Sequence, residues 1–394
     1  MVEFCDTGGA ATADRAPPLL GGGGGCTVAA VSPSPAVRRP RLRALVAAGM
    51  SLLGFAVVGY AILRFLEGAA VAERLRTISP GWLLLALLAW SLSIGVQTLR
   101  LRALVPASPR PPLSGFALVI LGSNAVHLAL PGPVAELGAA WALRQRYGVP
   151  MPSALAAALL ARVLALAIFG LATLGLWPLV ADRLPPSVSS AVWPLAISTG
   201  LLGAGLLGLL ARPSAVAAFA AGLADRLGRS PPLARYAERL GSRLRWWARC
   251  FAAVGELPLS RWAEAAALSV LNLLVLTGSA LLTFRALGLD AALLGTLFMQ
   301  ALTAVASVAG LLVPGGLGAV EVLVVLLFPL YAEGTTADAV FAALALRSVH
   351  LVTLVIGIPA MSWLIATLPD DPVERDEALA GALAADLDSP PGPS

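Results

Sequence analysis

The sequence contains no lysine, and all 27 of its basic residues are arginines. Charged residues make up only 12% of the 394, about half the share found in soluble globular domains. Because 58% of the residues are hydrophobic and the mean hydropathy is +0.85, a soluble globular protein is excluded. The chain is predicted to cross a membrane several times. Its many alanines, glycines and prolines indicate a genomic composition bias, which makes arginine counts less informative.

Cysteine is also scarce, and this removes whole classes of site. Cys5, Cys26 and Cys250 are far apart and form no CxxC pair or Cys/His cluster, so neither a disulfide framework nor a metal site is predicted. No nucleotide-binding loop or nucleophile–base pair is evident, so we expect no cofactor, no direct use of ATP and no enzyme activity. No basic soluble face is evident either, and a nucleic-acid partner is not expected. The net charge of +5 suits a protein beside anionic lipid.

Several apolar segments are long enough to cross a bilayer as helices. The first, residues 44–63, follows four arginines between residues 38 and 43, which predict a cytoplasmic N-terminus by the positive-inside rule. Further apolar segments lie at residues 81–99, 113–130, 153–179, 190–210, 262–284, 291–312, 320–331 and 338–368. Arg100, Arg102 and Arg110 follow the second segment, and we interpret them as markers of its cytoplasmic end.

Polar stretches flank and divide the predicted transmembrane domain, residues 38–368. Residues 1–37 and the acidic, proline-rich residues 369–394 are predicted to be disordered tails. Residues 212–261 form a linker with nine arginines and three carboxylates, and this positive excess predicts a cytoplasmic position. Part of the linker is either an amphipathic helix at the membrane interface or a solvated helix with an arginine-rich face.

Two apolar segments are interrupted where a membrane helix would be expected to continue. The break residues are Pro131, Gly132, Pro314, Gly315, Gly316 and Gly318. Proline removes a backbone donor and glycine weakens a helix, and backbone groups freed at membrane depth must face protein or water. Glu136 and Glu321 follow the two breaks, and ionisable residues at this depth indicate a functional site. A plain tight turn between two helices is the alternative.

The two interruptions belong to an internal repeat, in which residues 80–182 and 262–368 carry the same features in the same order. At an offset of 185 residues, Thr98-Leu99-Arg100 corresponds to Thr283-Phe284-Arg285, Glu136 to Glu321, and Arg162 to Arg347. The Pro-Gly pairs fall two positions off this register. We interpret the region as two homologous halves.

The arginines predict that the halves have opposite orientations. If residues 113–130 crossed the membrane completely, Arg144, Arg146 and the basic linker would lie outside, against the positive-inside rule. A re-entrant hairpin with the Pro-Gly break at its tip keeps them cytoplasmic, and only Arg285 then lies on the less favoured side. The predicted fold is an all-α polytopic membrane protein with about seven full spans and two re-entrant helical hairpins, arranged as inverted repeats. Both termini are predicted to be cytoplasmic, and this architecture is typical of transporters.

These motifs resemble a known membrane family. The matching residues are Asn124, LPG at 130–132 with Glu136, Ala161-Arg162, VPGGLGAVE at 313–321, and Arg347. They are similar to the flippase-like family typified by the lysylphosphatidylglycerol synthase transmembrane region, over about residues 80–368. The first motif departs from the family pattern, which usually has Arg near Pro133 and Gly near Ala135. The resemblance implies movement of lipid headgroups, such as aminoacylated phosphatidylglycerol or polyprenyl-linked sugars. Because no soluble synthase domain follows, it implies translocation or an accessory role, not aminoacyl transfer.

The candidate substrate-binding residues are Asn124, Glu136, Arg162, Glu321, Arg347 and His350. Each arginine either binds a lipid phosphate or forms an internal ion pair with a glutamate. The glutamates contact a cationic headgroup, couple protons, or simply occupy helix N-termini, where the helix dipole favours a carboxylate. His350 is either a proton relay or a polar contact in the bundle. Hydrogen bonds between helices are expected from Asn124, Gln97, Asn272 and Gln300.

Together these observations predict a lipid translocator of the cytoplasmic membrane that moves a phosphate-containing headgroup, with membrane lipids as its partners. A non-catalytic membrane partner of a glycosyltransferase or lipid synthase is the alternative. A membrane-embedded lipid transferase, with Glu321 or His350 as its base, is a third possibility. Neither the identity of the lipid nor the oligomeric state follows from the sequence.

Overall fold

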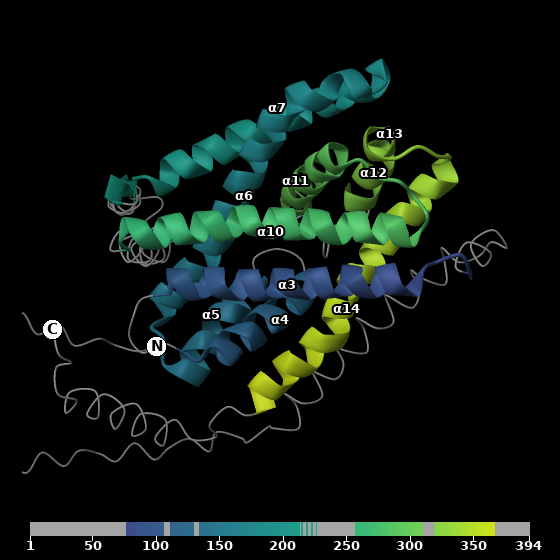
Figure 1. Ribbon diagram of the computed structural model, residues 1–394. Coiled ribbons are helices and arrows are strands. Elements are labelled where there is room, and N and C mark those ends of the chain that lie inside the picture. Colours follow the sequence, from purple (N-terminus) through teal and green to yellow (C-terminus); the bar gives the residue numbers. More distant parts are fainter. Residues whose placement is uncertain are drawn as a thin grey trace, which may run out of the picture. The chain divides into compact units, whose positions relative to one another are not determined.

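Helices are the only regular secondary structure among the described residues of the computed structural model (Figure 1). The described residues are 76–105, 111–129, 134–212, 257–309 and 319–366, with scattered positions between 214 and 226. Outside them lie the predicted first span at 44–63, both tails, most of the basic linker and all six break residues.

The helices follow the order of the two predicted halves. The first half contains α3 (Pro80–Leu104), α4 (Leu113–Ala129), α5 (Val134–Tyr147), α6 (Met151–Val180) and the 3-10 helix η1 (Ala181–Arg183). Next comes α7 (Pro186–Leu210). The second half contains α10 (Leu259–Ala286), α11 (Leu293–Ala309), α12 (Ala319–Leu326), α13 (Phe328–Tyr331) and α14 (Thr336–Ala366).

Five helices, α3, α6, α7, α10 and α14, are long and apolar enough to cross a membrane. They confirm as helices the segments predicted at 81–99, 153–179, 190–210, 262–284 and 338–368. Proline occupies the first turn of α3, α6 and α7, where its missing N–H has no helical acceptor to lose. The apolar helices α4 and α11 are shorter. Beyond a short undescribed stretch, α4 is followed by α5, whose first turn contains Glu136, and α11 is followed by α12, whose first turn contains Glu321.

The helices α3 and α10 pack along each other in an antiparallel arrangement (Figure 1). Near one end, the Ser79 backbone N–H donates to the Ala286 carbonyl oxygen at 2.9 Å. Towards the other end, Arg100 Nη1 donates to Ser269 Oγ at 3.3 Å. Residue numbers therefore rise along one helix as they fall along the other, and this helix pair joins the two halves.

Each short apolar helix packs against the long helix of the opposite half. The helix α4 contacts α14, and a Cβ added at Gly357 would overlap the Leu121 carbonyl oxygen. The helix α11 contacts α6, where the Trp177 and Phe298 rings have centroids 6.0 Å apart. The absence of a side chain at Gly357 thus allows the two backbones to approach closely, as small residues do between membrane helices. The two halves interlock through these crossed contacts.

Gly357→Ala is expected to lower the melting temperature of the detergent-solubilised protein, because the new methyl group must push α14 away from α4. Overpacking of this kind costs about 1–3 kcal/mol. Gly175→Ala in α6 is the matched control, since a Cβ there meets nothing within 4 Å. The control should melt at the same temperature as the wild type or slightly higher. Equal losses in both variants would contradict a tight α4–α14 contact.

Candidate functional site

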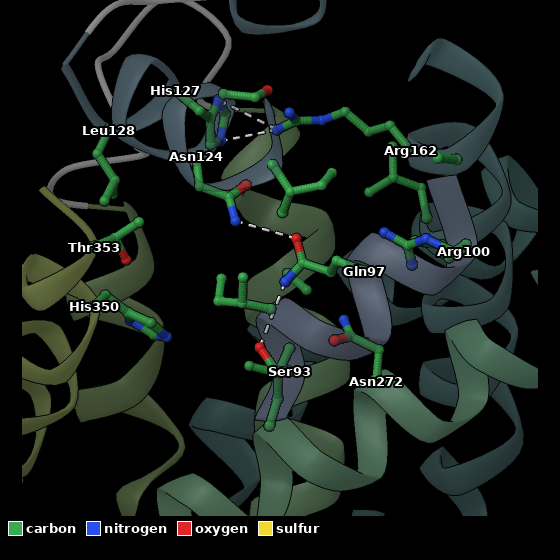
Figure 2. A pocket seen from close by; sticks show the side chains of 18 of the residues that line it. Ser93, Gln97, Arg100, Asn124, His127, Leu128, Arg162, Asn272, His350 and Thr353 are labelled. Carbon is green, nitrogen blue, oxygen red and sulfur yellow. Dashed lines mark hydrogen bonds between the residues drawn. The ribbon is translucent and has the colours of Figure 1, made fainter. Parts of the chain in front are cut away.

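A cavity of about 310 Å³ is lined by helices from both of the predicted halves. Its lining comes from α3, α4, α5 and α6 of the first half and from α10, α11, α12 and α14 of the second. The volume falls at the lower end of the range for small-molecule sites, roughly 300–1,000 Å³. Figure 2 shows that many of the labelled lining side chains are polar or charged. For a position between apolar helices, this polarity is unusual and marks the cavity as the candidate site.

Most of the predicted site residues meet in this cavity. Asn124, Glu136, Arg162, Arg347 and His350 line it. Glu321 is not part of the lining, but it forms an ion pair with Arg347. The fold therefore brings together residues that lie up to 226 positions apart in the chain. Among the described residues, no group of three His, Cys, Asp or Glu side chains is placed to hold a metal ion.

Glu136 and Arg162 form the ion pair of the first half. Arg162 Nη1 donates to Glu136 Oε1, and the Glu136 side chain is only 7% exposed. Arg162 Nη2 also lies 2.8 Å from His127 Nε2 (Figure 2). Because a guanidinium can only donate hydrogen bonds, the His127 nitrogen that accepts this bond carries no proton. Glu136 lies in the first turn of α5, where the helix dipole favours its charge.

Glu321 and Arg347 form the corresponding pair of the second half. Arg347 Nε lies 3.2 Å from Glu321 Oε1, and the side chains are 12% and 22% exposed. As in the first half, the glutamate lies in the first turn of the short helix, and the arginine lies within the following long helix. Both predicted Glu–Arg pairs are therefore formed, and each joins a short helix to a long one.

Three of the four neutral side chains predicted to join helices do so around the cavity, namely Gln97, Asn124 and Gln300, whereas Asn272 Oδ1 has no hydrogen-bond partner among the described residues. Asn124 Nδ2 donates to Gln97 Oε1 at 3.2 Å, and Gln97 Nε2 donates to Ser93 Oγ at 3.4 Å (Figure 2). Gln300 Nε2 of α11 donates to the Leu276 carbonyl oxygen of α10 at 3.3 Å. These bonds fix amide and hydroxyl groups at the cavity wall, where they are available to a ligand.

Arg100 also lines the cavity and lies within α3, so the predicted end of this apolar segment at Leu99 is wrong. The helix α3 continues to Leu104, and Arg100 is only 8% exposed. A signal was present in the sequence, because Leu101, Ala103 and Leu104 continue the apolar pattern past the arginine. By contrast Arg285, its counterpart in the repeat, is exposed and lies over the Trp82 ring at 5.6 Å from the centroid.

Arg162→Ala is expected to destabilise the protein by roughly 3 kcal/mol, because it leaves the buried Glu136 carboxylate without its cation. Thermal unfolding in detergent measures the effect. Arg261→Ala is the matched control, since Arg261 pairs with Glu264, which is 48% exposed. Exposed pairs contribute at most about 1 kcal/mol. Equal effects of the two substitutions would show that the Glu136 pair is not a buried one in the membrane protein.

Comparison with models of protein families identifies a family for this chain. The model of the family described as "Lysylphosphatidylglycerol synthase TM region" matches residues 45–357, a stretch that contains the entire lining of the cavity. A search of curated proteins finds no match to the chain.

Proposed function

Since the chain belongs to the lysylphosphatidylglycerol synthase TM region family, a group of multi-pass membrane proteins, we propose that it is a lipid translocator of the cell membrane. In this role it moves a phosphate-containing lipid headgroup across the bilayer without altering it chemically. The polar cavity between the two halves carries the proposal, because each half contributes a Glu–Arg pair there. Charged residues within apolar helices typically mark a substrate pathway.

The proposed topology consists of inverted repeats with about seven full spans and cytoplasmic termini. Antiparallel packing of α3 and α10 supports it, because these helices occupy equivalent places in the two halves. Equivalent helices that cross the same membrane antiparallel belong to halves of opposite orientation. The crossed contacts of α4 with α14 and of α11 with α6 support the same relation, since each is the counterpart of the other.

The two Glu–Arg pairs suggest how binding is coupled to movement. A lipid phosphate entering the cavity competes with Glu136 for Arg162 and with Glu321 for Arg347, because guanidinium binds phosphate and carboxylate in the same two-pronged way. An arginine that exchanges its glutamate for the phosphate no longer holds the short helix whose first turn contains that glutamate. A ligand shifts a conformational equilibrium only by differential affinity, and exchange of partners provides that difference.

Glu321→Gln is expected to slow lipid movement by about tenfold, because loss of one charge-assisted contact changes the free energy by roughly 1.5 kcal/mol. The measurement uses fluorescent lipids in liposomes containing the purified protein, with a quencher added outside to report the leaflet. Glu264→Gln is the matched control, since this glutamate is exposed and pairs with Arg261 three residues before it. Its rate should equal that of the wild type.

Lipids that are anionic, aminoacylated or linked to polyprenyl phosphate are tested separately. Failure of the wild type to move any of them contradicts translocation. In that case, recovery of movement or of lipid synthesis on adding a glycosyltransferase or a lipid synthase would favour the accessory role. Formation of a new lipid by the purified chain alone would instead favour an enzyme.

A further inference from the structure

The charges of the side chains in and beside the cavity do not sum to zero. Arg162 pairs with Glu136 and Arg347 pairs with Glu321, and both carboxylates are thereby compensated. Arg100 is a third cation in the lining, and within the described part of the chain its hydrogen bond goes to the neutral hydroxyl of Ser269. His127 accepts a hydrogen bond from Arg162, so it adds no charge, and histidine is mostly neutral at pH 7. The described residues of the lining, counted together with Glu321, which pairs with Arg347 from beside the cavity, therefore carry one net positive charge.

The environment of Arg100 makes this charge expensive in the empty cavity. Arg100 is 8% exposed, and its Nε has no hydrogen-bond partner among the described residues. Figure 2 shows its guanidinium at the cavity wall near Gln97 and Asn272. A buried, uncompensated cation is unfavourable by several kcal/mol, and an anion bound beside it removes much of this penalty. A phosphate suits the place best, because its oxygens accept two parallel N–H bonds from guanidinium.

The same charge balance disfavours two other classes of headgroup. One ammonium group on the headgroup would cancel the charge of the phosphate and leave the net positive charge of the cavity uncompensated, and two ammonium groups, as in a lysyl ester, would raise it to two, because both glutamates are already paired. A headgroup with two negative charges would leave one of them without a cation. One negative charge on the ligand brings the total to zero.

Two buried acceptors indicate what else the headgroup carries. Glu136 Oε2 and Asn272 Oδ1 have no hydrogen-bond partner in the described ranges, and both residues line the cavity. A buried acceptor without a donor is unfavourable by about 1–3 kcal/mol. Hydroxyl groups of a ligand satisfy both acceptors without changing the charge. The amides of Gln97 and Asn124 add further polar groups for such a ligand.

On the basis of the proposed function, we propose that the substrate is a monoanionic phosphodiester lipid with an uncharged, hydroxylated headgroup, and that Arg100 binds its phosphate. Phosphatidylglycerol has this chemistry, and so does a polyprenyl phosphate that carries one sugar. The lysyl ester of phosphatidylglycerol does not, because its two amines reverse the charge, and an ester with a single amine cancels it.

The test measures lipid retention by the purified full-length protein. The protein is incubated with equal amounts of phosphatidylglycerol, its lysyl ester, phosphatidylethanolamine and a polyprenyl phosphohexose, and native mass spectrometry quantifies what stays bound. Wild type is expected to retain at least one of the two monoanionic lipids about tenfold more than the lysyl ester, a difference of about 1.4 kcal/mol. Which of the two is enriched tells whether the lipid anchor is a diacylglycerol or a polyprenol.

Three variants test the role of Arg100. Arg100→Gln should abolish the preference over the lysyl ester, while Arg100→Lys keeps the charge and should retain most of it. Arg102→Gln is the matched control on the same helix, because Arg102 is partly buried and is not among the residues lining the cavity. The control should bind as wild type does. If Arg100→Gln does not fold, the loss of preference is tested by Arg100→Met, which keeps an unbranched apolar chain in place of the aliphatic part of the arginine.

Equal or stronger retention of the lysyl ester by wild type overturns the proposal, and so does retention of no lipid above background. Selectivity unchanged in Arg100→Gln overturns the role of Arg100. The leaflet measurement separates this proposal from translocation. Selective binding without movement contradicts only the translocation, whereas fastest movement of the lysyl ester contradicts only the choice of headgroup.

Discussion

A charge within an apolar helix bundle is tolerated only where another group compensates it, and this constraint organises the structure around the cavity. Each Glu–Arg pair satisfies it locally and at the same time ties a short helix to the long helix that follows. The glutamates gain further from the positive ends of α5 and α12. Because both pairs lie at the junction of the halves, the positions of these short helices depend on the ionic contacts as much as on apolar packing.

Much of this arrangement was predictable because it is encoded locally. Long apolar runs gave the five long helices, since length and hydropathy alone decide whether a segment can span a membrane. The pairing of Glu136 with Arg162, and of Glu321 with Arg347, was one of the two interpretations that the cost of an unpaired charge allowed, the other being an arginine that binds a lipid phosphate. Hydrogen bonds from Asn124 and Gln300 followed from the same reasoning applied to neutral groups.

The place of Arg100 at the cavity wall was not predicted. Its apolar neighbours in the sequence indicate that the helix continues past it, but what surrounds it is set by packing between distant segments. In the sequence, Arg100 and Arg285 occupy the same place in the repeat, at the end of an apolar run. In the structure one is buried at the cavity and the other is exposed over Trp82. The difference arises from neighbours, since α3 continues for a full turn past Arg100 while α10 ends one residue after Arg285. A repeat thus predicts where equivalent residues lie along the helices, but not which copy faces the site.

The different positions of Arg100 and Arg285 bear on how two similar halves can bind a ligand that has no symmetry of its own. In the proposed function, each half contributes an equivalent ion pair, and the arginine of either pair can exchange its glutamate for the lipid phosphate. A lipid, however, has one headgroup, and the protein must stay bound to it throughout the movement. In our proposal Arg100, the arginine that has no carboxylate partner among the described residues lining the cavity, is a fixed point for the phosphate, while the paired arginines exchange partners around it. In this proposal the two equivalent ion pairs support movement of the lipid, and Arg100, which has no equivalent at the cavity, recognises its phosphate.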